Sequence, residues 1–239
     1  MSRSAVLPPD QLGQEWTQTS ALEGLAALYE RQTRRGAYSR FGKRCIDLLV
    51  ALALLLGFLP LLVIAASVVV LTSGWPPFYM STRIGKGGKP FRMWKLWSMC
   101  KDADKVLATW LESDPGFKRQ FADRYKVQDD PRITPVGRFL MRSSIDELPQ
   151  LLNVVRGEMS LVGPRPIIRD ELEHYGPLAA RLLSTRPGST GLWQLKGRNT
   201  IQYPERVEVE SESASSSSHM GDARLLLRTR AAPLQFNGS

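Results

Sequence analysis

The sequence predicts a mainly α-helical protein with a small β element, held at a membrane by a re-entrant helical hairpin that leaves the following domain on the cytoplasmic face. Three observations lead to this prediction: a long apolar run, short β-like runs around a glycine-rich turn, and a series of helical patterns after them. At 239 residues, the chain can hold one good-sized domain with appended segments.

Four segments follow from the changes in composition along the chain. We expect a polar N-terminal extension over 1–40, the membrane hairpin over 41–76, the domain that carries the chemistry over 77–206, and a low-complexity C-terminal tail over 207–239. The tail includes the flexible run SESASSSS at 211–218.

The apolar run covers 48–71, 24 residues without a charge. As a helix it would reach roughly 36 Å, which is enough to cross a bilayer. Pro60 lies at its midpoint and should kink it strongly. Basic residues, which favour the cytoplasmic side, flank both ends: Arg40, Lys43 and Arg44 before the run, and Arg83, Lys86 and Lys89 after it. These features favour a hairpin in one leaflet; a proline-kinked spanning helix is the alternative, and a soluble core helix is disfavoured.

Beyond the hairpin, the runs PPFYM and PFRMWKLWSM predict two short strands joined by the turn RIGKGGK. Apolar periodicity predicts helices over 101–112, 116–126, 136–142, 145–155 and 167–184. The segments DPRITP, VGPRP and RPGSTG are expected to be loops, whose amides and guanidinium groups suit phosphate oxygens.

The chain has 32 basic and 23 acidic residues, a net charge of +9 and a pI near 9.8, which calls for a polyanionic partner. Without a nucleic-acid-binding signature, a phosphorylated substrate and anionic lipid are favoured over nucleic acid. The two cysteines do not indicate a disulfide framework, and the two histidines exclude a histidine-rich metal site. Any metal should therefore be oxygen-ligated and resemble magnesium.

The segment 143–166, SSIDELPQLLNVVRGEMSLVGPRP, carries most of the chemistry. Asp146 and Glu147 precede Pro149 near an expected helix start. Ser144 with Glu147 also forms a capping-box pattern, which is the structural alternative. The positive end of a helix should favour the ionised form of Asp146, and beside a phosphate this carboxylate is a potential nucleophile whose charge Mg²⁺ and arginines could neutralise. The surrounding arginines are Arg132, Arg138, Arg142, Arg156 and Arg165.

These motifs resemble the bacterial sugar transferases of the monotopic phosphoglycosyl transferase family, the undecaprenyl-phosphate hexose-1-phosphate transferases. The resemblance extends from about Arg40 to Arg206. It rests on KRCIDLLVA, FYMSTRIGKGGKPFRMWKLWSM, DPRITPVGRFL, SSIDELPQLLNVVRGEMSLVGPRP and RPGSTGLWQLKGRN, which occur in one order.

The resemblance implies a hairpin broken at Pro60 and a catalytic domain on the cytoplasmic face of the bacterial inner membrane. It implies that Asp146 attacks the sugar-bearing phosphate of a UDP-sugar, releases UMP, and passes the sugar phosphate to undecaprenyl phosphate. Glu147 would bind Mg²⁺ with Asp146 or handle a proton. The substrate-binding candidates are Lys95, Arg132, Arg142, Arg165 and Arg198. The implied partners are the UDP-sugar, undecaprenyl phosphate and membrane lipid, and a homo-oligomer is compatible with the sequence.

The sequence also departs from the family pattern. Met141 stands where an arginine is usual, Trp97 where a second basic residue is common, and Leu59 where a serine often precedes the hairpin proline. Arg142 adjoins Met141 but would point about 100° away on a helix. The tail beyond Arg206 diverges from the usual aromatic, amphipathic segment. The alternative function is therefore a catalytically weakened relative that serves as a membrane-bound assembly or interaction protein.

Overall fold

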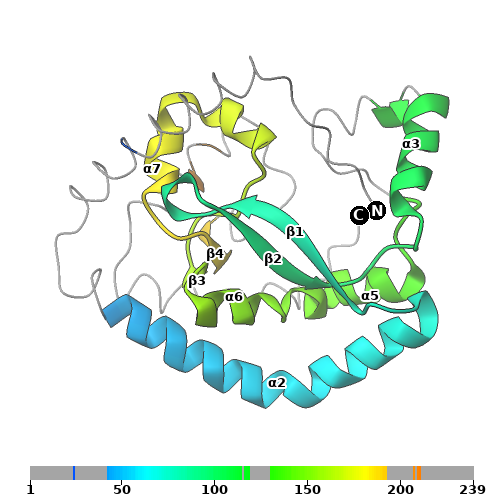
Figure 1. The fold of residues 1–239 in the computed structure, drawn as a ribbon, viewed down its shortest axis with the longest axis horizontal. Coiled ribbons are helices and arrows are strands. Elements are labelled where there is room, and N and C mark those ends of the chain that lie inside the picture. Colours follow the sequence, from blue (N-terminus) through cyan, green and yellow to red (C-terminus); the bar gives the residue numbers. More distant parts are fainter. Residues whose placement is uncertain are drawn as a thin grey trace.

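The computed structural model describes residues 24, 42–114, 116–118, 130–192, 207, 209 and 210. Expectations for 1–40, for most of 116–126 and of the C-terminal tail, and for Arg198 fall outside these residues. Within them the chain is mostly helical with two small sheets, as expected (Figure 1). The helices are α2 (Lys43–Ser73), α3 (Ala103–Ser113), α5 (Pro135–Ser143), α6 (Gln150–Arg156) and α7 (Ala179–Leu183), with 3₁₀ turns η2 (Lys86–Gly88), η3 (Ile145–Glu147) and η4 (Asp170–Leu178).

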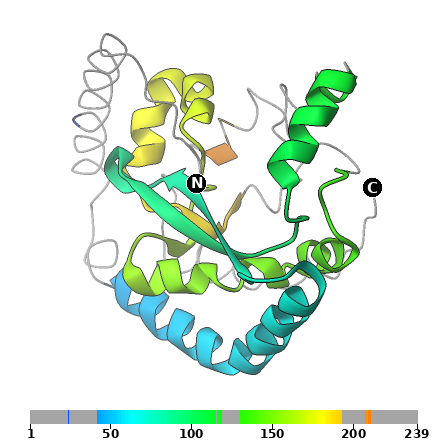
Figure 2. The same cartoon turned by 45° about the vertical axis from the view of Figure 1, so that its right-hand side comes forward.

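Helix α2 contains the whole apolar run and continues through Pro60 without interruption. Figures 1 and 2 show that it is bent near its middle, with both arms turned toward the rest of the chain. A proline inside a helix removes one backbone hydrogen bond and clashes with the preceding turn, which accounts for a bend at this position. The expected kink is confirmed, although the helix is bent rather than broken. The helix is long and apolar enough to cross a membrane, and its placement in one leaflet stays a prediction.

Most of the apolar surface of α2 faces outward. Leu49, Leu56 and Leu71 are 67%, 71% and 85% exposed. So many exposed leucines along one helix are unusual in a soluble domain. The inward side of each arm packs on a different core cluster. Ala51 of the first arm contacts the cluster formed with β2, α6 and β3, whereas Leu62 of the second arm belongs to a cluster with β2 and α5. Both arms are therefore attached to the domain.

Strands β1 (Phe78–Ile84) and β2 (Pro90–Leu96) form the predicted antiparallel hairpin around the glycine-rich turn. Gly87 in the turn has a positive φ of 69°, which favours glycine. In the register of the pair, Tyr79 lies opposite Lys95 and Arg83 lies opposite Phe91. Residues directly opposite each other project from the same face of a sheet. Lys95 and Arg83 therefore share one face of the hairpin.

A second, parallel pair was not predicted. It joins β3 (Ser160–Val162) to β4 (Gly188–Thr190); β4 lies within the expected loop RPGSTG, and β3 ends at the first residue of the expected loop VGPRP. The backbones approach so closely that a Cβ atom on Gly188 would lie 2.1 Å from the nitrogen of Gly163. Strands of three residues are too short to show an alternating pattern, so this pairing depends on the packing of the surrounding elements.

Two of the predicted helices have a different form. Over 145–155 the chain makes the 3₁₀ turn η3, a short turn at Leu148 and Pro149, and then α6. Over 167–184 it makes η4 and α7, and η4 is interrupted at Gly176, which has a φ of 46°. The helices predicted over 101–112 and 136–142 agree with α3 and α5 to within two residues.

Replacing Gly137 by alanine should destabilise the domain. A Cβ atom at this position of α5 would lie 1.9 Å from the carbonyl oxygen of Ser98, so α5 or the segment after β2 would have to move. We expect a loss of about 2 kcal/mol in the free energy of unfolding, which is measurable by thermal denaturation in detergent. Gly57→Ala is the matched control, because nothing lies within 4 Å of its added Cβ. Equal melting temperatures for the two variants would contradict the prediction.

Candidate active site

The two carboxylates directly follow the end of α5 at Ser144. This residue ends α5 in the left-handed conformation, with φ 57° and ψ 17°, and its backbone N–H donates to the carbonyls of Leu140 and Met141. An N-cap residue has extended backbone angles and accepts a hydrogen bond through its side chain, and Ser144 does neither. The alternative of a capping box is therefore wrong. Ser144 instead terminates one helix and starts the turn that carries Asp146 and Glu147.

Lys95 brings the two carboxylates together. Its Nζ atom lies 3.6 Å from Oδ2 of Asp146 and 3.4 Å from Oε1 of Glu147. Asp146 is buried, with 5% of its surface exposed, whereas the side chain of Glu147 is 36% exposed. Lys95 comes from β2, 52 residues before Glu147, so only the packing of η3 against β2 creates this contact. The structure thus unites three of the predicted site residues.

Burial controls the ionisation of Asp146. Loss of solvation raises the pKa of this carboxyl most strongly; Lys95 lowers it and Glu147 raises it, with a net pKa of about 6. Our expectation that a helix start would favour the ionised form was wrong in sign, because η3 is a single 3₁₀ turn and desolvation dominates. A carboxylate of this kind is ionised at neutral pH yet poorly solvated, and a poorly solvated anion is a more reactive nucleophile.

Asn153 fixes α6 against β2 and was not predicted. Its side chain is fully buried; Nδ2 donates to the carbonyl of Arg92 at 2.7 Å and to Oε2 of Glu158 at 2.7 Å, while Oδ1 accepts from the backbone N–H of Trp94 at 3.0 Å. Arg92 and Trp94 lie on the same strand as Lys95, three residues and one residue before it. The side-chain amide of Asn153 therefore joins the helix after Asp146 to the strand that carries Lys95.

Replacing Asn153 by alanine should cost about 3 kcal/mol of stability, because it leaves buried backbone and carboxylate groups without their partners. The loss should appear as a lower melting temperature of the detergent-solubilised protein. Ser113→Ala is the control, since its hydroxyl lies on the exposed surface of α3 and bonds only to a carbonyl one turn earlier. A melting temperature within one degree of the parent for Asn153→Ala would refute this role.

Arg132 is held by Asp130 in the loop before α5. Its Nε and Nη2 atoms donate to the carboxylate of Asp130 at 2.6–3.1 Å. Burial alone would raise the pKa of Asp130, but the hydrogen bonds and charge of Arg132 outweigh it and lower the pKa. The backbone carbonyl of Arg132 also accepts from the N–H of Cys100, which ties the loop to the segment after β2. A phosphate contact by Arg132 stays a prediction.

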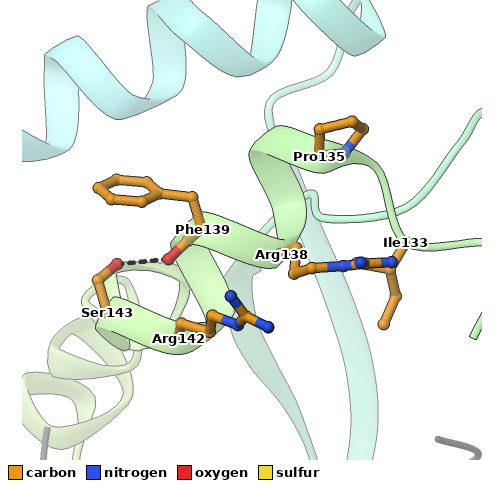
Figure 3. A pocket seen from close by; sticks show the side chains of 6 residues that line it. All are labelled: Ile133, Pro135, Arg138, Phe139, Arg142 and Ser143. Atoms are coloured by element: carbon orange, nitrogen blue, oxygen red, sulfur yellow. Dashed lines mark hydrogen bonds between the residues drawn. The ribbon is translucent and has the colours of Figure 1, made fainter. Parts of the chain in front are cut away.

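Arg142 lines a separate pocket of about 410 Å³ on α5. Figure 3 shows its guanidinium and that of Arg138 in this pocket, with the ring of Phe139 projecting away from both. Neither Asp146 nor Glu147 lines the pocket, and among the described residues the ion pairs of both carboxylates are with Lys95 and not with Arg142. Met141 is 38% exposed on the same helix.

Arg165 lies in the predicted loop after β3 and is paired with a buried carboxylate. Its Nη1 lies 3.3 Å from Oε1 of Glu171.

Trp97 has a structural role. Its ring packs edge-on against Tyr79 with 5.3 Å between ring centroids, and its Nε1 donates to the carbonyl of Met99 at 2.5 Å. The aromatic residue at position 97 is therefore accommodated by packing.

The carboxylates of Asp146 and Glu147 fit a magnesium ion. Mg²⁺ commonly takes one or two carboxylates together with substrate phosphates and water. The two groups already converge on one cation, the ammonium group of Lys95. Among the described residues, no cluster of three or more histidine, cysteine or acidic side chains forms a metal cage by itself. Substrate oxygens would have to complete the coordination.

Two further residues missed in the sequence attach the start of α2 to this region. Arg44 donates to the carbonyls of Val154 and Val155 at 2.5 and 2.8 Å, at the end of α6. Asp47 is buried and accepts from the hydroxyl of Ser160 at 2.8 Å and the N–H of Leu161 at 3.1 Å. The only signal in the sequence is an acidic residue at the edge of an apolar run, which by itself does not identify a partner.

The chain is similar to known proteins over most of its length. The family model described as bacterial sugar transferase matches residues 38–235. The chain is 41% identical over 197 residues to the exopolysaccharide production protein ExoY of Sinorhizobium fredii, covering 82% of this chain and 87% of that protein. It is 42% identical to the UDP-galactose-lipid carrier transferase of Erwinia amylovora and 40% identical to the undecaprenyl-phosphate galactose phosphotransferase of Salmonella typhimurium. Each of these matches covers 84% of this chain and 42% of the relative, so the chain spans less than half of those two proteins.

Proposed function

The chain belongs to the bacterial sugar transferase family, and on this premise we propose that it transfers a sugar 1-phosphate from a UDP-sugar to undecaprenyl phosphate. The products would be UMP and an undecaprenyl diphosphate sugar, the first membrane step of a bacterial polysaccharide or glycoconjugate. The observation that carries the proposal is the buried carboxylate of Asp146, held with Glu147 by Lys95 in a domain attached to both arms of a long apolar helix.

The proposed reaction has two balanced steps. In the first, a carboxylate oxygen of Asp146 attacks the phosphorus that bears the sugar, and the bond between that phosphorus and the oxygen of UMP breaks with its electron pair leaving on UMP. In the second, a phosphate oxygen of undecaprenyl phosphate attacks the same phosphorus, and the bond to Asp146 breaks to restore the carboxylate. Two successive displacements allow the water-soluble donor and the lipid acceptor to use one site in turn.

The residues around Asp146 support this role by controlling charge. Attack by a carboxylate on a diphosphate brings anions together, which requires cations positioned in advance. Lys95 is in place to neutralise the incoming phosphate while it keeps Asp146 oriented. Mg²⁺, held by Asp146 and Glu147 with substrate oxygens, would supply further neutralisation. Glu147 is more exposed than Asp146 and so suits contact with the ion or a substrate proton.

The long apolar helix supports a lipid acceptor. The phosphate of undecaprenyl phosphate is confined to the membrane interface by its tail, so the site must be held at that depth. The exposed leucines of α2 would enter the membrane, and the basic flanks would remain on the cytoplasmic side of the inner membrane. Because both arms of α2 pack on the domain, the helix would fix the height of Asp146 relative to the interface.

The proposal is tested by UMP release from the full-length protein in lipid nanodiscs with Mg²⁺. We would use a panel of UDP-sugars that begins with UDP-galactose and UDP-glucose, because relatives carry these hexoses in their names. Without acceptor, we expect a burst of at most one UMP per protein; with undecaprenyl phosphate, we expect continuous turnover. Acid-quenched protein should gain the mass of a sugar phosphate on the peptide containing Asp146.

Removal of Mg²⁺ by a chelator should stop both the burst and the turnover. A folded protein that releases no UMP from any UDP-sugar, with or without acceptor, would contradict the proposal and favour the alternative of a membrane-bound assembly protein. Continuous turnover with no covalent adduct and no burst would keep the overall reaction but reject the two-step mechanism.

A further inference from the structure

The face of the hairpin that carries Lys95 continues to a second polar group of residues. Every second residue of β1 projects from this face, which gives Tyr79, Ser81 and Arg83. Tyr79 lies directly opposite Lys95. The far end of the strand pairs with the loop containing Arg165, since the N–H of Ile84 donates to the carbonyl of Ile167 at 2.9 Å. Arg83 and Arg165 are thereby brought together at the end of the hairpin.

Arg83 and Ser81 have polar atoms without partners. Nε of Arg83 and Oγ of Ser81 are both buried, and neither has a hydrogen-bond partner among the described residues. Burial lowers the pKa of Arg83 most, and the like charge of Arg165 lowers it further, while Glu171 and Tyr79 raise it. Arginine nevertheless remains protonated in proteins. A buried guanidinium with an unused donor is expensive and is normally satisfied by an anion.

Glu171 is the carboxylate that acts on Arg83, and it already has other partners. It is 3% exposed; Oε1 accepts from Arg165 at 3.3 Å, and Oε2 accepts from the backbone N–H of Ile168 at 3.0 Å. Glu210 is the second buried acid in this region. Tyr175 donates a hydrogen bond to it, and burial raises the pKa of Glu210 to about 7. Glu171 therefore acts on both arginines, whereas burial disfavours the charged form of Glu210.

We propose that Arg83, Arg165 and the hydroxyl of Ser81 bind a phosphate oxyanion of one of the two substrates, as a site additional to Lys95. This inference rests on the proposed function. A guanidinium group with free N–H donors matches phosphate oxygens in geometry and charge. Arg83 lies four residues along β1 from the position opposite Lys95, roughly 13 Å of strand. The bound oxyanion would belong to the nucleoside-side phosphate of the donor or to the phosphate of the acceptor, since each of them must lie beside the phosphorus that Asp146 attacks and within reach of a long side chain from this face.

Steady-state kinetics of Arg83→Gln test the site and identify its ligand. UMP release would be measured in nanodiscs while UDP-sugar and undecaprenyl phosphate are varied separately. We expect KM for one substrate to rise at least tenfold, while kcat and KM for the other substrate change less than threefold. A rise for the UDP-sugar, with an equal weakening of inhibition by UMP, assigns the nucleoside-side phosphate; a rise for undecaprenyl phosphate assigns the acceptor. Arg83→Lys, which keeps the charge and a donor, should recover part of the affinity.

Arg92→Gln is the matched control, because it removes the same charge from the exposed, opposite face of β2. Both KM values within twofold of the parent in Arg83→Gln, or an equal rise in Arg92→Gln, would overturn the phosphate site while leaving the proposed function intact. If the parent protein has no turnover, calorimetric binding of inorganic diphosphate is the separate test. Binding that Arg83→Lys retains and Arg83→Gln loses supports the anion site without the function, and binding unaffected by Arg83→Gln overturns it.

Discussion

Replacing Asp146 by asparagine should lower UMP release by at least about 1,000-fold and abolish the covalent adduct, because an amide cannot form the acyl-phosphate bond. The folded state should tolerate the change. Burial already penalises the ionised form of Asp146, so a neutral side chain of the same shape should keep or raise the melting temperature. The combination of a lost reaction and retained stability separates a chemical role from a structural one.

Two matched variants make this result specific. Glu147→Gln should slow turnover yet still permit a sugar-phosphate adduct on Asp146, since Glu147 assists without forming the bond. Asp102→Asn, at an exposed residue paired only with Lys105 on α3, should leave both steps unchanged. An Asp146→Asn protein that retains full turnover would refute the covalent mechanism, and an adduct found on Glu147 would reassign the nucleophile.

Replacing Asp47 by alanine should weaken the connection between the membrane helix and the active site. The change leaves the N–H of Leu161 and the hydroxyl of Ser160 without their shared buried acceptor, and we expect it to cost about 3 kcal/mol of stability. If α2 fixes the height of the site at the interface, KM for undecaprenyl phosphate should rise several-fold more than KM for the UDP-sugar. A general loss of folded protein would lower the apparent kcat and leave both KM values unchanged.

The kinetic comparison needs a variant that perturbs stability by another route. Gly137→Ala serves this purpose, since it strains α5 without touching Asp47 or Ser160. Asp102→Ala controls for removal of an acidic side chain at an exposed position. Equal changes in the two KM values for Asp47→Ala, or the same acceptor-specific change in Gly137→Ala, would show that Asp47 does not couple α2 to acceptor binding.

Local pattern was sufficient for several elements. The apolar run, its kink at Pro60, and the hairpin around the glycine-rich turn each follow from residues close together in the chain. The role of Asp146 and Glu147 was predicted from a similar local pattern, because adjacent carboxylates among arginines suit phosphate chemistry, and it stays a prediction. The capping box was wrong for a reason that spacing cannot reveal: the pattern from Ser144 to Glu147 is compatible with a helix start, and the left-handed conformation of Ser144 comes from the end of α5.

The sequence by itself determined that this chain has a long apolar helix, a β hairpin and a pair of adjacent carboxylates of a kind that suits phosphate transfer. The tertiary structure decided which charges meet. It paired Lys95 with Asp146 and Glu147, and it paired Arg132 with Asp130. It also placed Arg142 in a pocket that neither Asp146 nor Glu147 lines. It also showed that Asp47 holds the apolar helix to β3. These contacts join residues far apart in the chain, and their pairing depends on burial and packing, which short-range spacing does not encode.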